Sequence, residues 1–399
     1  MKAVNMKKQL NIGLFGFGAV GQGLYEVLQH SPATHASINQ ICIKDTEKKR
    51  ILPANFFTND ASKLLSNPET NLIVELIDDA EEAYQIVKSA LIKGKSVVSG
   101  NKKMLAHHLP EFIEMQQKNG VGILYDASAC GSIPVIRNLE EYYNNDLTQS
   151  VTGILNGSSN YILSKMFNDN LDYEDALKQA QDLGFAESNP ALDVDGFDAL
   201  YKLIIITVHA FGVYVRPDRV FRFGISGISK DDIHFAKEKG FKIKLVAHVR
   251  KDESGKLCLS VIPRMVSPDK YIYNVENEFN GVVIKGAFYD KQFMFGRGAG
   301  GHPTGSAVLS DITAREYNYR YEYKKMKLED KPVFSNDCTR KVYFRFEDQQ
   351  KLEGLPFENI EESYRSKEFN YVIGNISIEE LFKQKDWLAK QDVFLAEIP

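Results

Sequence analysis

Short apolar runs alternate with amphipathic segments along the first 135 residues. This alternation predicts a parallel sheet with helices on both faces. The expected strands lie at residues 11–15, 38–43, 72–77, 95–99 and 121–125, and the expected helices at 22–29 and 81–93. Ligands on such sheets bind beyond the carboxyl ends of the strands. That rule selects the segments at residues 16–21, 44, 78, 99–102 and 126–134.

From residue 152 the pattern becomes that of an α+β region. Residues 156–160 predict a polar turn and residues 295–302 a second glycine-rich loop. The expected helices lie at 161–166, 172–183, 198–211 and 304–315, and the expected strands at 244–249, 257–263, 281–288, 341–346, 371–373 and 393–396. Asp172 is a suitable N-cap and Gly184 a suitable stop for the helix at 172–183.

We therefore expect an α/β fold with three parts. The first is a Rossmann domain, a doubly wound parallel sheet, over residues 1–135, to which the helix near 304–315 is a candidate to return. The second is an α+β domain over residues 136–320. The third is a small α+β extension over residues 321–399.

The composition is typical of a soluble globular protein, with 43% hydrophobic and 26% charged residues. The net charge of −4, with both signs interspersed, gives no reason to expect a nucleic acid or a membrane as partner. Four scattered cysteines without a CxxC pair argue against a zinc cluster and against a disulfide scaffold. Residues 1–10 lack the apolar core of a signal peptide, and no apolar run is long enough to span a bilayer, so the cytoplasm is the expected location.

The segment Gly16-Phe-Gly18-Ala-Val-Gly21 has the spacing GxGxxG between an expected strand and an expected helix. In that context Gly16 permits a tight turn, Gly18 lets the backbone approach a pyrophosphate, and Gly21 lets the helix pack against the strand. The helix N-terminus adds N–H groups and a partial positive charge. The motif indicates a dinucleotide site, and the alternative is an ordinary glycine-rich turn.

The end of the second expected strand bears on which nicotinamide cofactor binds. Units that bind NAD usually place an acid there, for the ribose 2′-hydroxyl. This strand ends instead in Lys44, and a cation suits a 2′-phosphate, so NADP(H) is favoured. Asp45 keeps NAD(H) open, and the basic run 48–50 is equally well a solvated turn.

Two lysines are candidates for proton chemistry. Lys102 follows the strand that ends at Ser99, where it could donate a proton or hold a substrate carboxylate; the alternative is an ordinary surface lysine. Lys202 lies four residues after Asp198 among apolar neighbours, where proton affinities shift. The alternative is a surface i,i+4 ion pair. The same cluster contains Glu187, Asp193 and Asp195.

Taken in order, several segments resemble the homoserine dehydrogenase family. They are residues 16–21, 74–77, 99–102, 127–134, 153–163, 180–187, 193–202 and 296–304. The segments 153–163 and 184–202 are the most specific to the family. The resemblance implies that the second domain binds substrate and dimerises, and that the protein is a homodimer acting on a small molecule.

The resemblance also implies a reaction. The family interconverts L-aspartate 4-semialdehyde and L-homoserine, in threonine, methionine and isoleucine biosynthesis, by passing hydride to or from a nicotinamide cofactor. Lys202 matches the proposed proton donor and acceptor, and Lys102 a lysine near both nicotinamide and substrate. Residues that match substrate contacts are Glu187, Asp198 and Asp193. Residues that match cofactor contacts are Gly16, Gly18, Ala19, Val20, Gly21, Lys44, Ser99, Lys102, Gly184 and Gly298.

The family further holds a monovalent cation, often sodium, through backbone carbonyls. The matching positions are Asp126, Ala129, Gly131 and Ile133. Carbonyl ligation leaves little trace in side-chain identity, so the match rests on position alone.

Two features depart from the family pattern. Asp78-Asp79 replaces a usual Gly-Gly pair, and two carboxylates near a cofactor phosphate would repel it unless they point away or meet a cation. This pair keeps open a non-catalytic nucleotide sensor as an alternative. A second alternative is another amino-acid dehydrogenase on the same scaffold, such as one acting on aspartate, against which Glu187, Asp198 and Lys202 argue. The tail after about residue 335 opens like an ACT module but lacks a clear glycine-rich ligand turn, so we expect a degenerate ACT-like extension.

Overall fold

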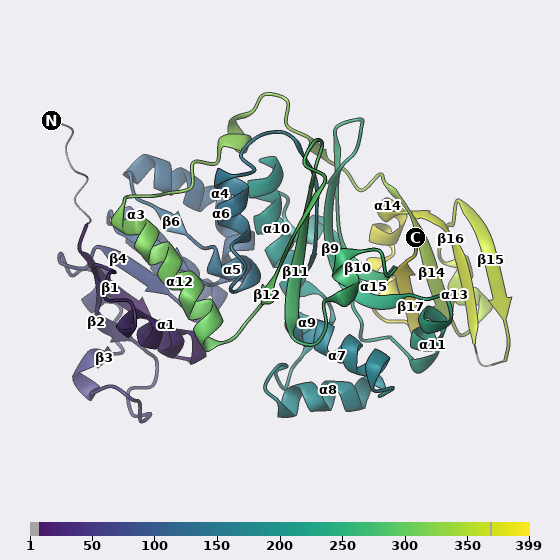
Figure 1. Cartoon of the computed structure of the whole chain (residues 1–399), viewed down its shortest axis with the longest axis horizontal. Helices are drawn as coiled ribbons and strands as arrows, with labels where there is room; N and C mark the ends of the chain where they lie inside the picture. Colours follow the sequence, from purple (N-terminus) through teal and green to yellow (C-terminus); the bar gives the residue numbers. More distant parts are fainter. Residues whose placement is uncertain (1–7, 368) are drawn as a thin grey trace. The chain divides into compact units, whose positions relative to one another are not determined.

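The computed structural model describes residues 8–367 and 369–399, and the chain divides into two compact units (Figure 1). The first unit contains the chain up to Asn144 together with Arg297–Lys324. The second contains Asn145–Gly296 together with Lys325–Pro399. Each unit is therefore built from two separate stretches of chain, whereas the sequence predicted three parts, with the helix near 304–315 as a candidate to return to the first.

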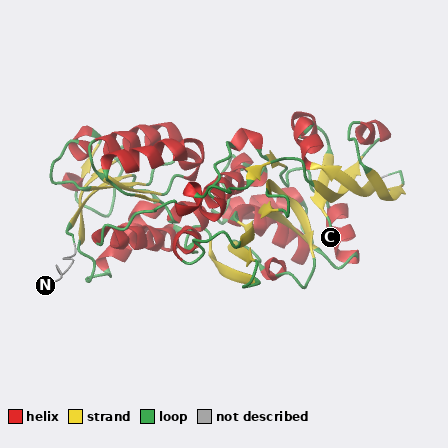
Figure 2. Ribbon diagram, turned by 90° about the horizontal axis from the view of Figure 1, so that it is seen from above, coloured by secondary structure: helices red, strands yellow, loops and turns green. Residues whose placement is uncertain are grey.

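A parallel sheet with the strand order β3-β2-β1-β4-β5-β6 forms the centre of the first unit. Its strands are β1 (Leu10–Phe15), β2 (Ala36–Cys42), β3 (Phe57–Thr58), β4 (Leu72–Glu75), β5 (Ser96–Ser99) and β6 (Ile123–Leu124). Strands β4 and β5 are buried throughout, because helices cover both faces of the sheet (Figure 2). The strand order reverses between β1 and β4, where doubly wound folds bind their ligands. The predicted Rossmann architecture is confirmed.

The helices of the first unit come from both of its stretches. They are α1 (Ala19–Gln29), η1 (Ala54–Phe56), α2 (Ser62–Leu65), α3 (Ala80–Ile92), α4 (Lys102–Asn119), α5 (Ala127–Cys130), α6 (Val135–Glu141) and α12 (Gly301–Glu316). Helix α12 packs closely on α1, since a Cβ added to Gly305 would lie 2.7 Å from the carbonyl carbon of Gly23. The imidazole of His302 also pairs with the carboxylate of Glu26 on α1. These contacts hold α12 in the first unit.

A mixed sheet with the order β12-β11-β7-β9-β10-β17-β14-β16-β15 runs through the second unit. Its strands are β7 (Thr148–Ile154), β8 (Phe221–Arg222), β9 (Lys242–Lys251), β10 (Lys256–Val266), β11 (Phe279–Gly286), β12 (Lys291–Arg297), β13 (Val333–Phe334), β14 (Thr339–Phe346), β15 (Asn359–Arg365), β16 (Asn370–Ser377) and β17 (Val393–Glu397), of which β8 and β13 pair with β10 beside the main order. The helices are α7 (Gly157–Asn168), α8 (Tyr173–Asp182), α9 (Ala191–Val194), α10 (Phe197–Phe211), η2 (Pro217–Arg219), α11 (Lys230–Glu238), η3 (Tyr271–Asn274), η4 (Lys324–Lys327), α13 (Gln349–Glu353), α14 (Ile378–Lys383) and α15 (Lys385–Leu388).

The C-terminal part of the second unit has a regular topology of its own. Its elements run β14-α13-β15-β16-α14-α15-β17, and the strands lie in the order β17-β14-β16-β15. This is the βαββαβ arrangement of ferredoxin-like folds. One apolar core contains Phe221 and Ile262 together with Phe344 and Leu395. Because the core includes β8 and β10, the C-terminal strands pack as part of the second unit rather than as a separate extension.

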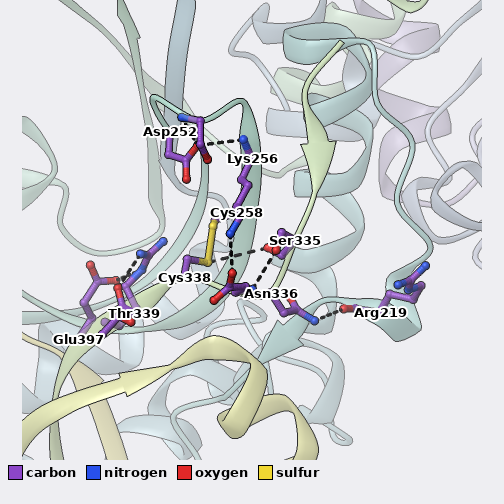
Figure 3. Close-up of a disulfide and its surroundings, with 12 residues drawn as sticks. Arg219, Asp252, Lys256, Cys258, Ser335, Asn336, Cys338, Thr339 and Glu397 are labelled. Carbon is purple, nitrogen blue, oxygen red and sulfur yellow. Dashed lines mark hydrogen bonds and ion pairs between the residues drawn. A yellow bond between two sulfur atoms is a disulfide. The ribbon is translucent and has the colours of Figure 1, made fainter. Parts of the chain in front are cut away.

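A disulfide joins Cys258 in β10 to Cys338, which precedes β14 (Figure 3). The scattered cysteines argued against a disulfide scaffold, and they do form a single bond across 80 residues of sequence. The reason is topological, because β13 pairs in parallel with the start of β10 and brings the two cysteines together. Beside the bond, the ammonium group of Lys256 lies 2.5 Å from the carboxylate of Asp337. Sequence spacing could not reveal this pairing.

Two predicted loops are regular structure. Asn156 is the N-cap of α7, whose first turn takes the place of the predicted polar turn, because its side chain accepts the N–H of Ser159. Residues 295–297 are the end of β12 instead of part of a glycine-rich loop. The predicted cap Asp172 and stop Gly184 of α8 are confirmed. None of the helices in the described residues is long and apolar enough to cross a membrane.

Candidate functional site

In the glycine-rich turn between β1 and α1, two glycines allow close backbone packing and a third leaves open space. Gly16 has a φ of +91°, and a Cβ there would lie 2.5 Å from the carbonyl oxygen of Leu76. A Cβ on Gly21 would lie 2.5 Å from the carbonyl oxygen of Gly16. At Gly18, a Cβ would meet no described atom within 4 Å. The turn itself requires Gly16 and Gly21, whereas Gly18 leaves open space at the surface.

This open space adjoins the N-terminus of α1, because Gly18 is the N-cap of that helix. Among the described residues, no side chain caps this end, and its first turn contains no acidic residue. The backbone N–H groups of Ala19, Val20 and Gly21 are the initial donors of the helix, and such groups bind phosphates. The turn therefore fits the pyrophosphate of a dinucleotide.

Glu75 organises the two loops that follow β4 and β5. Its carboxylate accepts hydrogen bonds from the backbone N–H of Ile77 (2.8 Å) and from the hydroxyl of Ser99 (2.5 Å). Complete burial raises the pKa of Glu75 from its ordinary 4.5 to about 7. The Ser99 hydroxyl also accepts the N–H of Asn101, whose side chain caps α4. This series of contacts fixes the backbone at Lys102, the first residue of α4.

Two of the predicted cofactor residues thus differ in exposure. Ser99 is fully buried and its hydroxyl is engaged by Glu75 and Asn101, so its side chain supports the loop. Lys102 is half-buried at the carboxyl edge of the sheet. The sequence analysis did not single out Glu75, although an acid inside an otherwise apolar strand is the signal that could have found it.

Asp79 has a structural use that the sequence analysis did not foresee. Its carboxylate caps α3 by accepting the N–H groups of Glu81 (3.0 Å) and Glu82 (2.9 Å). These hydrogen bonds, with that from Glu82 the strongest influence, lower the pKa of Asp79. Asp78 and Asp79 also line a cavity of about 430 Å³ together with Lys103. The cap accounts for one of the two carboxylates that replace the family's glycines.

Lys44 lies just beyond the carboxyl end of β2, as predicted. Its ammonium nitrogen is 2.7 Å from a carboxylate oxygen of Glu82 on α3. The hydrogen bond that Lys44 donates to the Glu82 carboxylate, followed by the charge of that carboxylate, raises the pKa of Lys44. The neighbouring Asp45 uses its carboxylate to accept the N–H groups of Glu47 and Lys48, so this stretch is a solvated turn. Glu82 is a second residue that sequence reasoning missed.

The segment 126–133 packs against Arg297 and Gly298, the first residues of the second stretch of the first unit. Gly131 has a φ of +55°, and a Cβ there would lie 2.5 Å from the carbonyl oxygen of Gly298. The carbonyl of Asp126 accepts the N–H of Ala129, and that of Ile133 accepts the N–H of Val135. A carbonyl oxygen has two lone pairs, so each keeps one for a further ligand. Of the four predicted carbonyl positions, these two therefore have capacity for a cation.

The side chain of Asp126 is engaged elsewhere. Its carboxylate is buried and accepts the N–H groups of Ile136 (2.8 Å) and Arg137 (3.1 Å) at the start of α6. Burial, followed by the nearby Asp311, raises the pKa of Asp126. Arg137 donates to Asp311 at 2.7 Å, so the guanidinium partly compensates the two carboxylates. This network fixes the loop and gives the Asp126 carboxylate a structural role.

Lys202 and Asp198 form a buried ion pair on α10. The Lys202 ammonium nitrogen is 2.6 Å from the Asp198 carboxylate and donates to the carbonyl of Leu155 at 2.7 Å. Lys202 is 7% exposed and Asp198 5% exposed. The pair was predicted, and the alternative of a solvated surface pair is wrong. A charge held in an apolar helix is constrained in both position and hydration.

Asn156 joins this pair to a second carboxylate. Its amide donates to Asp193 (2.7 Å) and to Asp198 (3.0 Å). Burial, followed by the charge of Asp198, raises the pKa of Asp193, and the hydrogen bond from Asn156 opposes this rise. Asn156 was missed as a site residue. Its signal was available, because an asparagine before a helical run is a typical N-cap.

The other predicted residues of the second unit lie on loops. Gly184 ends α8 with a φ of +74° and is exposed. Glu187 is exposed, and its backbone carbonyl accepts the side-chain amide of Gln181. The carboxylate of Asp195 accepts the hydroxyl of Ser226. Of the acidic cluster, the structure joins Asp193, Asp198 and Lys202 in one hydrogen-bonded group.

The buried side chain of Lys244 supports α7. Lys244 donates to the carbonyl of Val275 (2.6 Å) and to the side chain of Asn160 on α7 (3.2 Å). The amide of Asn160 donates to the carbonyls of Val275, Asn277 and Phe279. Burial lowers the pKa of Lys244 to about 8. These contacts anchor the helix whose N-cap is Asn156.

In residues 8–367 and 369–399, no group of three or more His, Cys, Asp or Glu side chains is arranged to hold a metal ion.

Comparison with protein families and relatives gives a consistent result. A family model described as homoserine dehydrogenase matches residues 134–313, and one described as its NAD-binding domain matches residues 16–126. The chain is 36% identical over 322 residues to a homoserine dehydrogenase of Bacillus subtilis, which covers 78% of this chain and 74% of that protein. It is 37% identical over 314 residues to one of Helicobacter pylori, covering 77% and 74%.

Solved structures agree. A homoserine dehydrogenase from Thiobacillus denitrificans superposes with a TM-score of 0.85 at 27% identity, over 98% of both chains. A hyperthermophilic archaeal homoserine dehydrogenase in complex with NADPH has a TM-score of 0.68 at 26% identity, over 79% of this chain and 99% of that one.

Proposed function

The chain belongs to the homoserine dehydrogenase family and is an oxidoreductase, and we propose that Lys202 is the proton donor and acceptor of its reaction. That reaction interconverts L-aspartate 4-semialdehyde and L-homoserine. The observation that supports this role is the buried group of Lys202, Asp198 and Asn156.

Reduction of the aldehyde places negative charge on its oxygen. A bound nicotinamide cofactor supplies or accepts the hydride. The ammonium group of Lys202 stabilises the developing alkoxide and gives it a proton, and in the reverse direction the neutral amine removes the proton from the alcohol. Asp198 and the Leu155 carbonyl hold this ammonium group in one orientation, at 2.6 and 2.7 Å.

We assign the amino end of the substrate to carboxylates of the second unit. An ammonium group needs negative partners, and Asp193 and Asp198 are held side by side by Asn156. Glu187, on the exposed loop after α8, is proposed as a further contact.

We assign the dinucleotide to the first unit. The pyrophosphate is expected at the N-terminus of α1, where Gly18 leaves open space. Lys44 would meet the 2′-phosphate of NADP(H), which we favour, with NAD(H) as the alternative. Lys102 would lie toward the nicotinamide end, with Gly298 as a further point of close approach. The turn at Gly16 and the cap at Asn101 support this arrangement.

Three further assignments complete the proposal. Sodium is proposed at the backbone carbonyls of residues 126, 129, 131 and 133, since a carbonyl oxygen with one hydrogen bond can still accept a further ligand. A homodimer is proposed on the resemblance to the family. The cytoplasm is proposed as the site of action, because nicotinamide cofactors are available there.

The test is homoserine-dependent reduction of NADP and, separately, of NAD, followed by absorbance with and without sodium. Turnover with a preference for NADP would support the function and the role of Lys44. Turnover with NAD alone would keep the function and remove that role. Cofactor binding without any turnover by the folded protein would favour a nucleotide sensor, and Asp78 would be the first residue to change to glycine.

A further inference from the structure

The ion pair between Lys44 and Glu82 lies where a dinucleotide site distinguishes its two cofactors. Lys44 comes two residues after Cys42, the last residue of β2, and the carbonyl of Cys42 accepts the N–H of Gly16 in the phosphate turn. In doubly wound sheets, the residue at the end of this strand meets the ribose hydroxyl of NAD or the 2′-phosphate of NADP. The end of β2 and the phosphate turn are thus joined by a hydrogen bond.

Glu82 reaches this place from a different element. It lies in the first turn of α3, and its carboxylate is 2.7 Å from the Lys44 ammonium group. The same carboxylate, after burial, contributes to the raised pKa of Cys42, which places its charge at the end of β2 independently of Lys44. Asp79, the cap of α3, also interacts electrostatically with Lys44. One cation is therefore opposed by two carboxylates.

The ion pair can exchange partners at little cost. The Lys44 side chain is 73% exposed and that of Glu82 43% exposed. Ion pairs at such exposure contribute little to stability. A 2′-phosphate could replace Glu82 beside Lys44, but it would then lie close to a carboxylate of like charge. A 2′-hydroxyl could instead donate a hydrogen bond to Glu82.

We propose that Glu82 is a specificity-determining residue that competes with the 2′-phosphate for Lys44 and accepts the 2′-hydroxyl of NAD(H). Lys44 favours NADP(H), and Glu82 limits that preference, so the protein binds both cofactors. This inference rests on the proposed function only in placing the dinucleotide at the Gly16–Gly21 turn. Sequence position alone assigned the discrimination between NADP(H) and NAD(H) to Lys44. In this proposal, Lys44 and Glu82 determine it together.

The test measures binding of NADPH and NADH to the full chain through the fluorescence of the reduced nicotinamide. Glu82→Gln removes the charge and keeps the shape. We expect its Kd for NADPH to fall by about fivefold and its Kd for NADH to rise, because removing one nearby like charge is worth about that factor. Glu81→Gln is the matched control, since it removes a charge from the same helix turn and its carboxylate pairs with Gln85. It should leave the ratio of the two Kd values within about twofold.

A second variant separates the two partners. Lys44→Met should weaken NADPH and leave NADH nearly unchanged, and Glu82→Gln should have less effect on NADPH in that background. If Glu82→Gln changes the ratio no more than Glu81→Gln does, the inference is overturned while the cofactor site stands. If the folded wild-type protein binds neither NADPH nor NADH, the proposed function and this inference fail together.

Discussion

The two units present their chemical groups by opposite means. In the first unit, the phosphate turn depends on missing side chains, because Gly16 and Gly21 allow close backbone packing and Gly18 leaves space beside free N–H groups. In the second unit, the proposed chemistry depends on charged side chains inside an apolar helix, since Lys202 and Asp198 are almost fully buried. A backbone site is encoded by local spacing, whereas a buried charged site is encoded by its distant partners.

The units also differ in how their distant segments are attached. Helix α12 joins the first unit through close glycine contacts with α1 and through Asp311, which accepts a hydrogen bond from Arg137. The C-terminal segment joins the second unit through a shared apolar core and the disulfide from Cys258. The two arrangements predict different responses to single substitutions.

The largest effect is expected at the buried pair. Lys202→Ala should lower kcat by about a thousandfold, because it removes the proposed proton donor. The Kd for NADPH should stay within about twofold of wild type, since the dinucleotide is assigned to the first unit. Steady-state kinetics and nicotinamide fluorescence measure the two quantities, and circular dichroism checks the fold.

Lys165 provides a matched control for that change. It forms an ion pair of the same spacing with Asp169, at 2.9 Å, but at the surface of α7. Lys165→Ala should leave kcat within about twofold. A Lys202→Ala variant that turns over normally would remove Lys202 from the mechanism. The chemistry of the second unit would then not depend on its buried charged side chain.

The disulfide gives the next largest effect. Cys338→Ser should lower the free energy of unfolding of the second unit by about 2–4 kcal/mol under oxidising conditions, because the bond closes a long loop. Urea unfolding with and without reductant measures the change. The reduced wild-type protein should behave like the variant. Equal stability of oxidised wild type and variant would mean that the shared apolar core alone holds the C-terminal segment.

The sequence predicted backbone-encoded features well. The strand, turn and helix around Gly16–Gly21, the cap Asp172 and the helix of Lys202 follow from short-range patterns, and the structure confirms them. It missed features that need tertiary contact. The Cys258–Cys338 bond depends on pairing between strands far apart in sequence. Asn156 acquires its carboxylate partners only when α7 packs against α9 and α10.

The same distinction explains the residues that changed role. The sequence suggested that the Asp79 carboxylate would repel a cofactor phosphate. In the structure this carboxylate caps the N-terminus of α3. Ser99 matches a cofactor contact of the family, and in the structure its buried hydroxyl also supports the loop by donating to Glu75. In both, the residue type was informative and only the neighbours decided its use.

A smaller effect concerns the pH dependence of stability. Because the pKa of Glu75 rises to about 7 on folding from an ordinary 4.5, the folded state holds a proton that the unfolded state has lost. Its contribution to the free energy of unfolding is therefore complete below pH 4.5 and is lost as the pH rises through 7, by about 3 kcal/mol. Glu75→Gln should flatten this part of the profile, measured by urea unfolding from pH 4.5 to 8. Glu114→Gln, an exposed change on α4, should keep the wild-type slope, and an unaltered slope in Glu75→Gln would contradict the assignment.

The smallest effect tests the backbone site most directly. At Gly18 a Cβ would meet nothing in the described chain within 4 Å, so Gly18→Ala should leave the melting temperature within about 2 °C. The same methyl group would occupy the space assigned to the pyrophosphate, so the Kd for NADPH should rise about tenfold, or about 1.4 kcal/mol. Fluorescence titration and thermal unfolding measure the two effects on one sample.

Gly21→Ala gives the opposite pattern at the same turn. Its methyl group would meet the carbonyl oxygen of Gly16 at 2.5 Å, so stability should fall by about 1–3 kcal/mol. Cofactor binding would weaken only as a consequence. If Gly18→Ala binds NADPH like wild type, the open space at Gly18 is not where the pyrophosphate lies. The cofactor site of the first unit would then not depend on the absence of a side chain at Gly18. If Gly18→Ala is instead destabilised as much as Gly21→Ala, then Gly18 belongs with the glycines that the turn itself requires.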